Sequence, residues 1–152
     1  MGRVFFNTRL NISKIGGADY SMIESDSGKT FMLLPTAARL ITLPVLGTGV
    51  GQAGEGWNCK LVLDDAATGV DQGFNFKCNV DMGSGVNLAN RGFIMDTDSG
   101  AGDFCVANDD FINISVNASA GDTIHFWTDG VRWNIEGFVK DATEVAFAQA
   151  AA

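Results

Sequence analysis

Hydrophobic and polar residues alternate along much of this chain with a period of two. Residues 57–63 read WNCKLVL and residues 74–80 read FNFKCNV, so every second side chain is apolar. Because successive side chains of a β-strand point to opposite faces, both segments predict strands with one buried face. Further short candidates span residues 20–24, 30–34, 39–43, 91–95, 103–107 and 111–117. With the two strands of a hairpin over residues 121–137, these segments predict about nine or ten strands and no convincing helix.

Residues 121–137, GDTIHFWTDGVRWNIEG, predict a β-hairpin that turns at Asp129-Gly130. A two-residue Asp-Gly loop favours a type I′ turn, which requires positive φ at both positions. That turn would set Thr128 opposite Val131. The register then places Phe126 opposite Trp133 and Ile124 opposite Ile135 on one face, with His125 opposite Asn134 and Trp127 opposite Arg132 on the other.

The chain has 152 residues and 19 glycines, which suits one domain with many turns between short strands. We predict an all-β fold: a single antiparallel β-sandwich, jelly-roll-like, with an extended N-terminal arm. The arm, residues 1–18, carries Arg3, Arg9 and Lys14 but no acidic residue before Asp19, and it is expected to dock on a partner or to form an edge strand. The sandwich spans residues 19–139. Residues 140–152 form an Ala-rich tail with high helix propensity that is too short to be stable alone.

The net charge of −8 argues against nucleic acid or an anionic membrane as a partner, because both require clustered Lys and Arg. No apolar run reaches the length of a membrane span, and the N-terminus lacks the features of a signal peptide. Cys59, Cys78 and Cys105 have no metal-binding spacing. Cys59 and Cys78 lie in alternating apolar runs, so we expect buried free thiols and synthesis in a reducing cytosol.

We find no catalytic constellation, and we predict a non-enzymatic protein without a cofactor. His125 is the only histidine, and neither a nucleophile motif nor an orienting carboxylate accompanies it. Ser27 to Thr30 resembles the end of a phosphate-binding loop, but Ile23 stands where the first glycine belongs and a strand follows. Gly47, Gly49 and Gly51 lack the spacing of a dinucleotide loop.

Asp96, Asp98 and Asp103 lie within eight residues, separated by small residues. Such a set offers oxygen ligands to a hard cation such as Ca²⁺, but the spacing is not that of an EF-hand. A solvated turn is the favoured interpretation, and a cation site is the alternative.

Three segments, in order along the chain, resemble small bacteriophage virion proteins. They are residues 20–31 (YSMIESDSGKTF), residues 41–57, in which Ile41 to Pro44 and a Gly-rich loop lead to Trp57, and residues 121–137 with Thr128 to Gly130 and Trp133. The resemblance covers residues 19–139. The proteins it points to are trimeric β-sandwich modules that serve as capsid decoration (cement) proteins, with related modules in tail fibres.

The resemblance implies a virion structural protein, made in the cytoplasm of a bacterial host. It would bind the outer capsid surface as a homotrimer, contact the major capsid protein and stabilise the shell. We expect Arg3, Val4, Phe5, Phe6 and Arg9 to dock on the capsid, and Phe111 and Trp127 to contribute to the trimer contact. The alternatives are a tail-fibre or spike module and a carbohydrate-binding jelly roll with Trp127 as the sugar platform.

Overall fold

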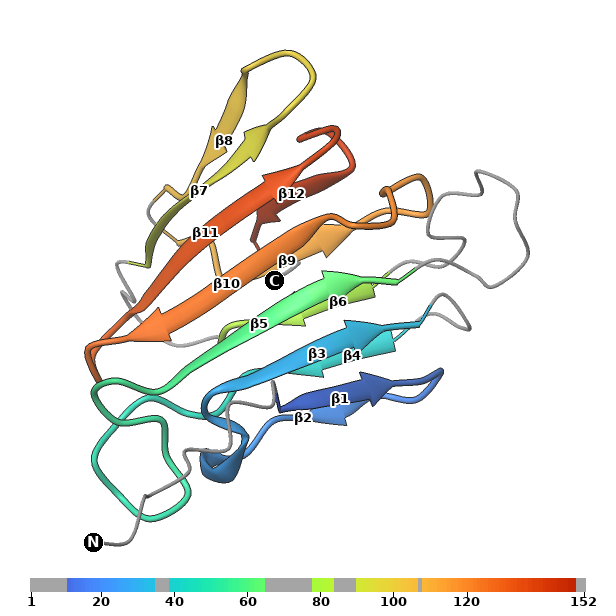
Figure 1. Cartoon of the computed structure of the whole chain (residues 1–152). Coiled ribbons are helices and arrows are strands. Elements are labelled where there is room, and N and C mark those ends of the chain that lie inside the picture. The colour runs from blue at the N-terminus through green and yellow to red at the C-terminus, as the bar shows by residue number, and fades with distance from the viewer. Residues whose placement is uncertain (1–10, 35–38, 65–77, 84–89, 107, 150–152) are drawn as a thin grey trace, which may run out of the picture.

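The computed structural model describes residues 11–34, 39–64, 78–83, 90–106 and 108–149. Two β-sheets lie face to face around one apolar core (Figure 1). The predicted all-β sandwich is therefore confirmed.

Within the described residues, the larger sheet has seven strands and the smaller has five. In spatial order, the seven-stranded sheet contains β1 (Ile12–Ile15), β3 (Lys29–Leu33), β5 (Asn58–Leu63), β10 (Thr123–Thr128), β11 (Trp133–Val139), β7 (Arg91–Asp96) and β8 (Gly102–Phe104). The five-stranded sheet contains β12 (Val145–Ala148), β9 (Phe111–Ile114), β6 (Cys78–Asp81), β4 (Arg39–Thr42) and β2 (Tyr20–Ser21). A single 3₁₀ turn, η1 (Glu24–Asp26), joins β2 to β3 within the described residues.

Both sheets are mixed, whereas the sequence predicted antiparallel pairing throughout. From β1 to β6 the chain moves to the other sheet after every strand, so odd strands lie in one sheet and even strands in the other. A chain that crosses over and back re-enters each sheet in its former direction. The pairs β1–β3, β3–β5, β2–β4 and β4–β6 are accordingly parallel. In this half of the sandwich the chain thus winds between the two sheets and adds parallel strands to each. In the seven-stranded sheet, antiparallel pairing begins where β5 meets β10.

The alternation seen in the sequence marks the core. In β5 the side chains of Cys59, Leu61 and Leu63 are at most 1 % exposed, whereas Lys60 is exposed. On the inner side of the same sheet, the indole rings of Trp57, just before β5, and Trp133, in β11, meet edge to face with centroids 5.3 Å apart. Of the predicted strand at residues 74–80, only residues 78–80 lie within the described part, and they belong to β6.

The β10–β11 hairpin forms as predicted, with a register two residues away from the prediction. Thr128 pairs with Trp133 and Phe126 pairs with Ile135. Gly130 has a φ of 85°, but among the described residues Asn108 alone combines a side chain with positive φ, so a type I′ turn at Asp129-Gly130 is wrong. Instead the Asp129 carboxylate accepts the amides of Val131 and Arg132 at 3.0 and 2.9 Å, which favours a longer loop. A shift of two residues preserves the faces, and Phe126 and Trp133 are buried as expected.

Both chain ends contribute edge strands. Residues 12–15 of the predicted arm form β1, which is the edge-strand alternative, and β1 pairs with β3. The Ala-rich tail forms strand β12 against β9, where the sequence indicated helix propensity. Val145 in β12 is fully buried, and this burial against β9 outweighs the intrinsic preference of the surrounding alanines.

Candidate functional site

The side of the seven-stranded sheet that faces away from the core carries an unusual mixture of exposed aromatic and charged side chains. We call it the outer face. Cross-strand pairing aligns one row of its residues: Thr30, Lys60, His125, Glu136, Phe93 and Phe104. The row changes character along its length, polar over β3, β5 and β10 and aromatic over β7 and β8. The outer face therefore offers two different candidate surfaces.

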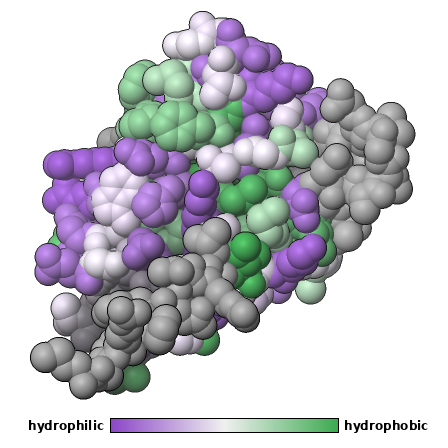
Figure 2. Space-filling model, viewed as in Figure 1, coloured by the Kyte–Doolittle hydropathy of each residue, from purple (hydrophilic) through white to green (hydrophobic). Residues whose placement is uncertain are grey.

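The first surface, the aromatic patch, consists of Phe93, Phe104 and Phe138. Phe104 is 64 % exposed and Phe138 is 51 % exposed. The Phe93 and Phe138 rings meet edge to face at 6.1 Å, and Phe93 lies opposite Phe104 in the β7–β8 pair. Figure 2 shows hydrophobic residues gathered over β7 and β8 on this side of the molecule. Rigid strands thus hold several large apolar side chains in contact with water.

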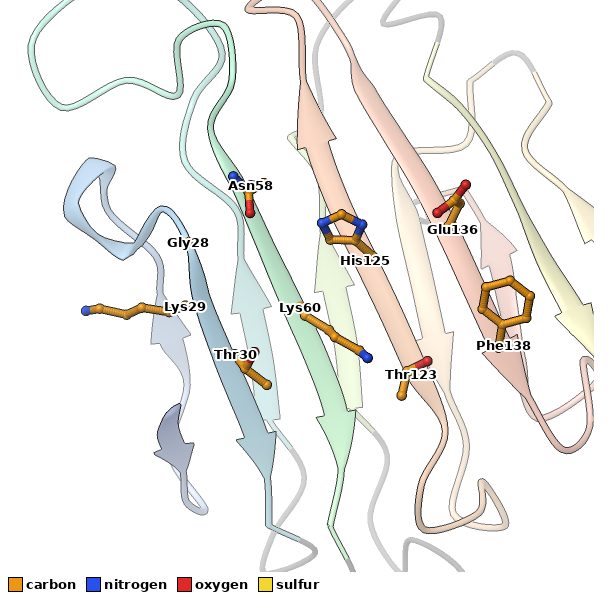
Figure 3. A pocket seen from close by; sticks show the side chains of 9 residues that line it. All are labelled: Gly28, Lys29, Thr30, Asn58, Lys60, Thr123, His125, Glu136 and Phe138. Carbon is orange, nitrogen blue, oxygen red and sulfur yellow. The ribbon is translucent and has the colours of Figure 1, made fainter. Parts of the chain in front are cut away.

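The second surface is a shallow hollow of about 270 Å³ over β3, β5, β10 and β11 (Figure 3). Its lining residues are Gly28, Lys29, Thr30, Asn58, Lys60, Thr123, His125, Glu136 and Phe138. Beside the hollow, the His125 and Trp127 rings lie 5.3 Å apart with planes inclined by 34°. The hollow thus presents amide, hydroxyl, ammonium and carboxylate groups, and an aromatic pair lies at its side, with His125 in the lining and Trp127 next to it.

The two lysines of the hollow differ in their partners. The Lys29 ammonium lies 2.6 Å from the Asp26 carboxylate, so its charge is already paired. Neither Lys60 nor Glu136 forms an ion pair or a side-chain hydrogen bond with another described residue, although His125 alone separates them in the row. In Figure 3 the Lys60 side chain extends across the face toward Thr123. A donor and an acceptor of opposite charge therefore remain available to a ligand.

The structure does not bring the two predicted trimer-contact residues together. Trp127 lies on the outer face in β10. Phe111 lies in β9 of the other sheet, where buried Ile112 and Ile114 point inward and Phe111 points away from the core. The two side chains thus belong to opposite sides of the sandwich. The predicted capsid-docking residues Arg3, Val4, Phe5, Phe6 and Arg9 lie outside the described residues.

The acidic loop after β7 behaves as a turn. The Asp96 carboxylate accepts the backbone amides of Asp98 and Ser99, each at 2.8 Å, and the amide of Ser99 contributes most to holding the pKa of Asp96 below its ordinary range. Asp103 accepts the amide of Phe147 at 2.7 Å. In the described part of the chain, no group of three or more His, Cys, Asp or Glu side chains is placed to hold a metal ion.

The cysteine side chains that the structure describes are poor nucleophiles. Cys59 is buried, and burial raises the pKa of its thiol far above neutrality. Burial, with the nearby carboxylates of Asp109 and Asp103, raises the pKa of Cys105 to about 11. Both thiols are therefore protonated at neutral pH.

Comparisons of the chain with protein families, with curated proteins and with solved structures found no match. The part of the chain that the structure describes contains no helix with the length and hydrophobicity of a membrane span.

Proposed function

We propose that this protein is a structural component of a bacteriophage virion: a head decoration (cement) protein that binds the outer capsid surface as a homotrimer and stabilises the shell. The resemblance of residues 19–139 to small virion proteins suggests the class. The aromatic patch is the observation that carries the proposal, because it gives this β-sandwich a surface suited to a protein contact.

The patch favours a subunit contact for energetic reasons. Phe104 and Phe138 are each at least half exposed, and neighbouring Phe93 makes the apolar surface continuous. Fully burying one such side chain contributes about 1.5–3 kcal/mol. Contiguous apolar surface on a folded domain is typical of protein–protein contacts. Strands hold these rings in place, so little conformational freedom would be lost on association.

The geometry also changes which residues we assign to the trimer. In a closed trimer, the contact surfaces of each subunit lie close together around the threefold axis, where three copies of one patch are able to meet. Trp127 and Phe111 lie on opposite sides of the sandwich, and a contact that joined those sides would stack subunits without closing. We therefore assign the contact to the aromatic patch rather than to Trp127 and Phe111.

A decoration protein that binds only the assembled lattice stabilises it by mass action. Asn11, the first described residue, immediately precedes β1 at the edge of the seven-stranded sheet. The proposed docking segment, residues 1–10 with Arg3, Val4, Phe5, Phe6 and Arg9, is thus attached at one edge of the sandwich. The proposed trimer contact is nearer the other edge, over β7 and β8, so one molecule is able to use both.

Light scattering at micromolar concentration tests the trimer. We expect the parent protein to have the mass of three chains and a Phe104→Ser/Phe138→Ser variant to have the mass of one. Val50→Ser is the matched control, because Val50 is fully exposed on the Gly-rich loop, away from the patch. A parent protein that remains monomeric, or a double variant that still forms trimers, would contradict the proposed contact.

Binding to purified shells tests the decoration role itself. We expect the protein to co-sediment with shells of the major capsid protein and to raise the temperature at which they disassemble. A tail-fibre or spike module would instead be found at low copy number at the tail of the intact particle, so its position there decides between the two.

A further inference from the structure

We propose that the hollow of the outer face is a carbohydrate-binding site that takes a neutral pyranose ring, with Trp127 and His125 as its stacking surface. This inference goes beyond the decoration role and does not depend on it. The aromatic pair, the polar groups of Lys60 and Glu136 and the size of the hollow support it, and Phe138 is the one residue that the hollow shares with the aromatic patch.

The aromatic pair provides the apolar part of the site. Trp127 and His125 project from the same face of β10, are partly exposed, and are inclined by 34° to one another. A pyranose presents a face of C–H groups and a rim of hydroxyls. A complementary surface therefore has an apolar centre and a polar, solvated edge. Partly exposed aromatic rings on a rigid strand meet that requirement at small entropic cost.

The polar groups provide orientation. Lys60 and Glu136 lie on either side of His125, and two strand spacings of about 4.8 Å separate their positions by roughly 10 Å. That span accommodates a sugar ring with its hydroxyl rim. The side-chain NH₂ group of Asn58 donates to the backbone carbonyl of Gly56. The side-chain oxygen Oδ1 of Asn58 is then an additional acceptor beside the hollow.

The charges select a neutral ligand. An anion drawn to Lys60 would also face Glu136, and a cation drawn to Glu136 would face Lys60. A sugar hydroxyl both donates and accepts, so one neutral ring satisfies the ammonium and the carboxylate together. The volume of about 270 Å³ lies just below the range of small-molecule pockets and suits one or two sugar rings. Because the hollow is shallow, we expect a Kd of about 1 mM.

The protein carries its own reporter for this site. Of its three tryptophans, Trp57 and Trp133 are 3 % and 0 % exposed, whereas Trp127 is partly exposed beside the hollow. Quenching of tryptophan fluorescence by acrylamide therefore reports mainly on Trp127. A saccharide stacked on Trp127 should protect it from quenching, and the concentration dependence of the protection gives the Kd.

The test titrates the full chain with maltotriose, cellotriose, lactose and mannotriose, and with digalacturonate as the anionic comparison. We expect at least one neutral saccharide to protect Trp127 at about 20 mM, well above the expected Kd. Absence of protection by all four neutral saccharides, or protection by digalacturonate alone, would overturn the proposal.

Variants then locate the site. Glu136→Gln and Lys60→Met should each weaken binding about tenfold, because each leaves a sugar hydroxyl without its charged partner. Trp127→Ala should abolish binding as measured by saturation-transfer NMR, whereas Trp127→Phe keeps a ring and should retain it. Phe104→Ser, in the aromatic patch but outside the hollow, is the control and should bind like the parent. Equal binding by Trp127→Ala and the parent would overturn the assignment. Trp127→Ala should still form trimers and bind shells, so the two proposals can fail separately.

Discussion

At the scale of single residues, close backbone contact between β7 and β11 depends on glycine. Gly92 pairs with Ile135 and Gly137 pairs with Ile94. A Cβ atom added at Gly92 would lie 2.3 Å from the carbonyl oxygen of Ile135, and one added at Gly137 would lie 2.8 Å from Cγ1 of Ile94. The first clash is the more severe, because a backbone carbonyl in a sheet cannot move aside without breaking the pairing.

We therefore predict that Gly92→Ala lowers the free energy of unfolding by about 1–3 kcal/mol. Gly16→Ala is the control, because no atom lies within 4 Å of its added Cβ and its φ is not in the left-handed region. It should be neutral or slightly stabilising, as expected for Gly to Ala at an unstrained position. Urea denaturation measures both variants, and equal stability of Gly92→Ala and the parent would refute the close approach of β7 to β11.

Asp26 is a second residue with a large local effect. It is 1 % exposed and accepts hydrogen bonds from the Ile23 amide at 3.0 Å, the Tyr20 hydroxyl at 3.2 Å and the Lys29 ammonium at 2.6 Å. Burial alone would raise the pKa of this carboxyl, but the Lys29 ammonium and the other two donors outweigh burial, and the pKa lies below its ordinary value of 3.8. The ionised carboxylate thus joins β2, η1 and β3.

A lowered pKa in the folded state gives stability that is present above the unfolded pKa and lost as pH falls through the folded pKa. We expect Asp26→Asn to cost about 1–3 kcal/mol at pH 7. The difference in unfolding free energy between parent and variant should shrink as the pH falls below about 4. Glu55→Gln, which removes an exposed carboxylate, is the control. A difference that stays constant from pH 7 to pH 2 would show that ionisation of Asp26 does not matter.

At the scale of elements, one buried arginine connects strand ends in the part of the sandwich with parallel pairing, from β1 to β6. Arg39 begins β4 and is 5 % exposed. Its guanidinium donates to the carbonyl of Ile15 at 2.7 Å and also to the carbonyls of Gly16 and Leu34. One side chain from the five-stranded sheet thus binds the chain just past the ends of β1 and β3, where two strands of the other sheet terminate.

We predict that Arg39→Met destabilises the protein by about 2–4 kcal/mol, because three carbonyls lose a charged donor. Hydrogen exchange should rise first in β1, which pairs with β3 alone in the part of the chain that the structure describes. Arg91→Met is the control, because Arg91 is exposed on the outer face. Unchanged protection of β1 amides in Arg39→Met would rule out this role for the guanidinium.

The sequence predicts strands better than it predicts their partners. Alternation in residues 57–63 depends only on which side chains are buried, and β5 has the predicted inward face. Parallel pairing of β1, β3 and β5 depends on where the chain crosses between sheets, and no local pattern records that. The hairpin register failed for a local reason: the side chains of Thr128 and Asp129 bind backbone groups of the loop, which a rule based on the Asp-Gly dipeptide does not consider.

At the scale of the whole molecule, the candidate surfaces combine residues that are distant in the chain. Trp127 stood out in the sequence as an exposed aromatic residue. Phe93, Phe104 and Phe138 did not, because each occurs alone in its segment and only the β8–β7–β11 arrangement brings them together. The opposition of Lys60 and Glu136 across His125 likewise requires the pairing of β5, β10 and β11. These surfaces therefore become visible only once the sheet order is known.

The N-terminal segment provides the last prediction, which tests the capsid contact in the proposed decoration role. Because β1 begins at Ile12 and pairs with β3, a deletion that extends to residue 15 would remove a strand of the sandwich. Deleting residues 2–10 spares β1, so the truncated protein should unfold at the temperature of the parent and remain a trimer. It should lose binding to shells, because Arg3 and Arg9 with Val4, Phe5 and Phe6 are the proposed contacts.

Two substitutions divide that contact into its charged and apolar parts. Salt screens charges over the Debye length, which is about 10 Å at 0.1 M and becomes shorter at higher salt. Arg3→Gln/Arg9→Gln should therefore weaken shell binding mainly at low salt. Phe5→Ser/Phe6→Ser should weaken binding equally at low and high salt, because apolar burial is not screened. If the protein without residues 2–10 occupies shells as fully as the parent does, the capsid contact lies on the sandwich, and the assignment of Arg3, Val4, Phe5, Phe6 and Arg9 to docking is wrong.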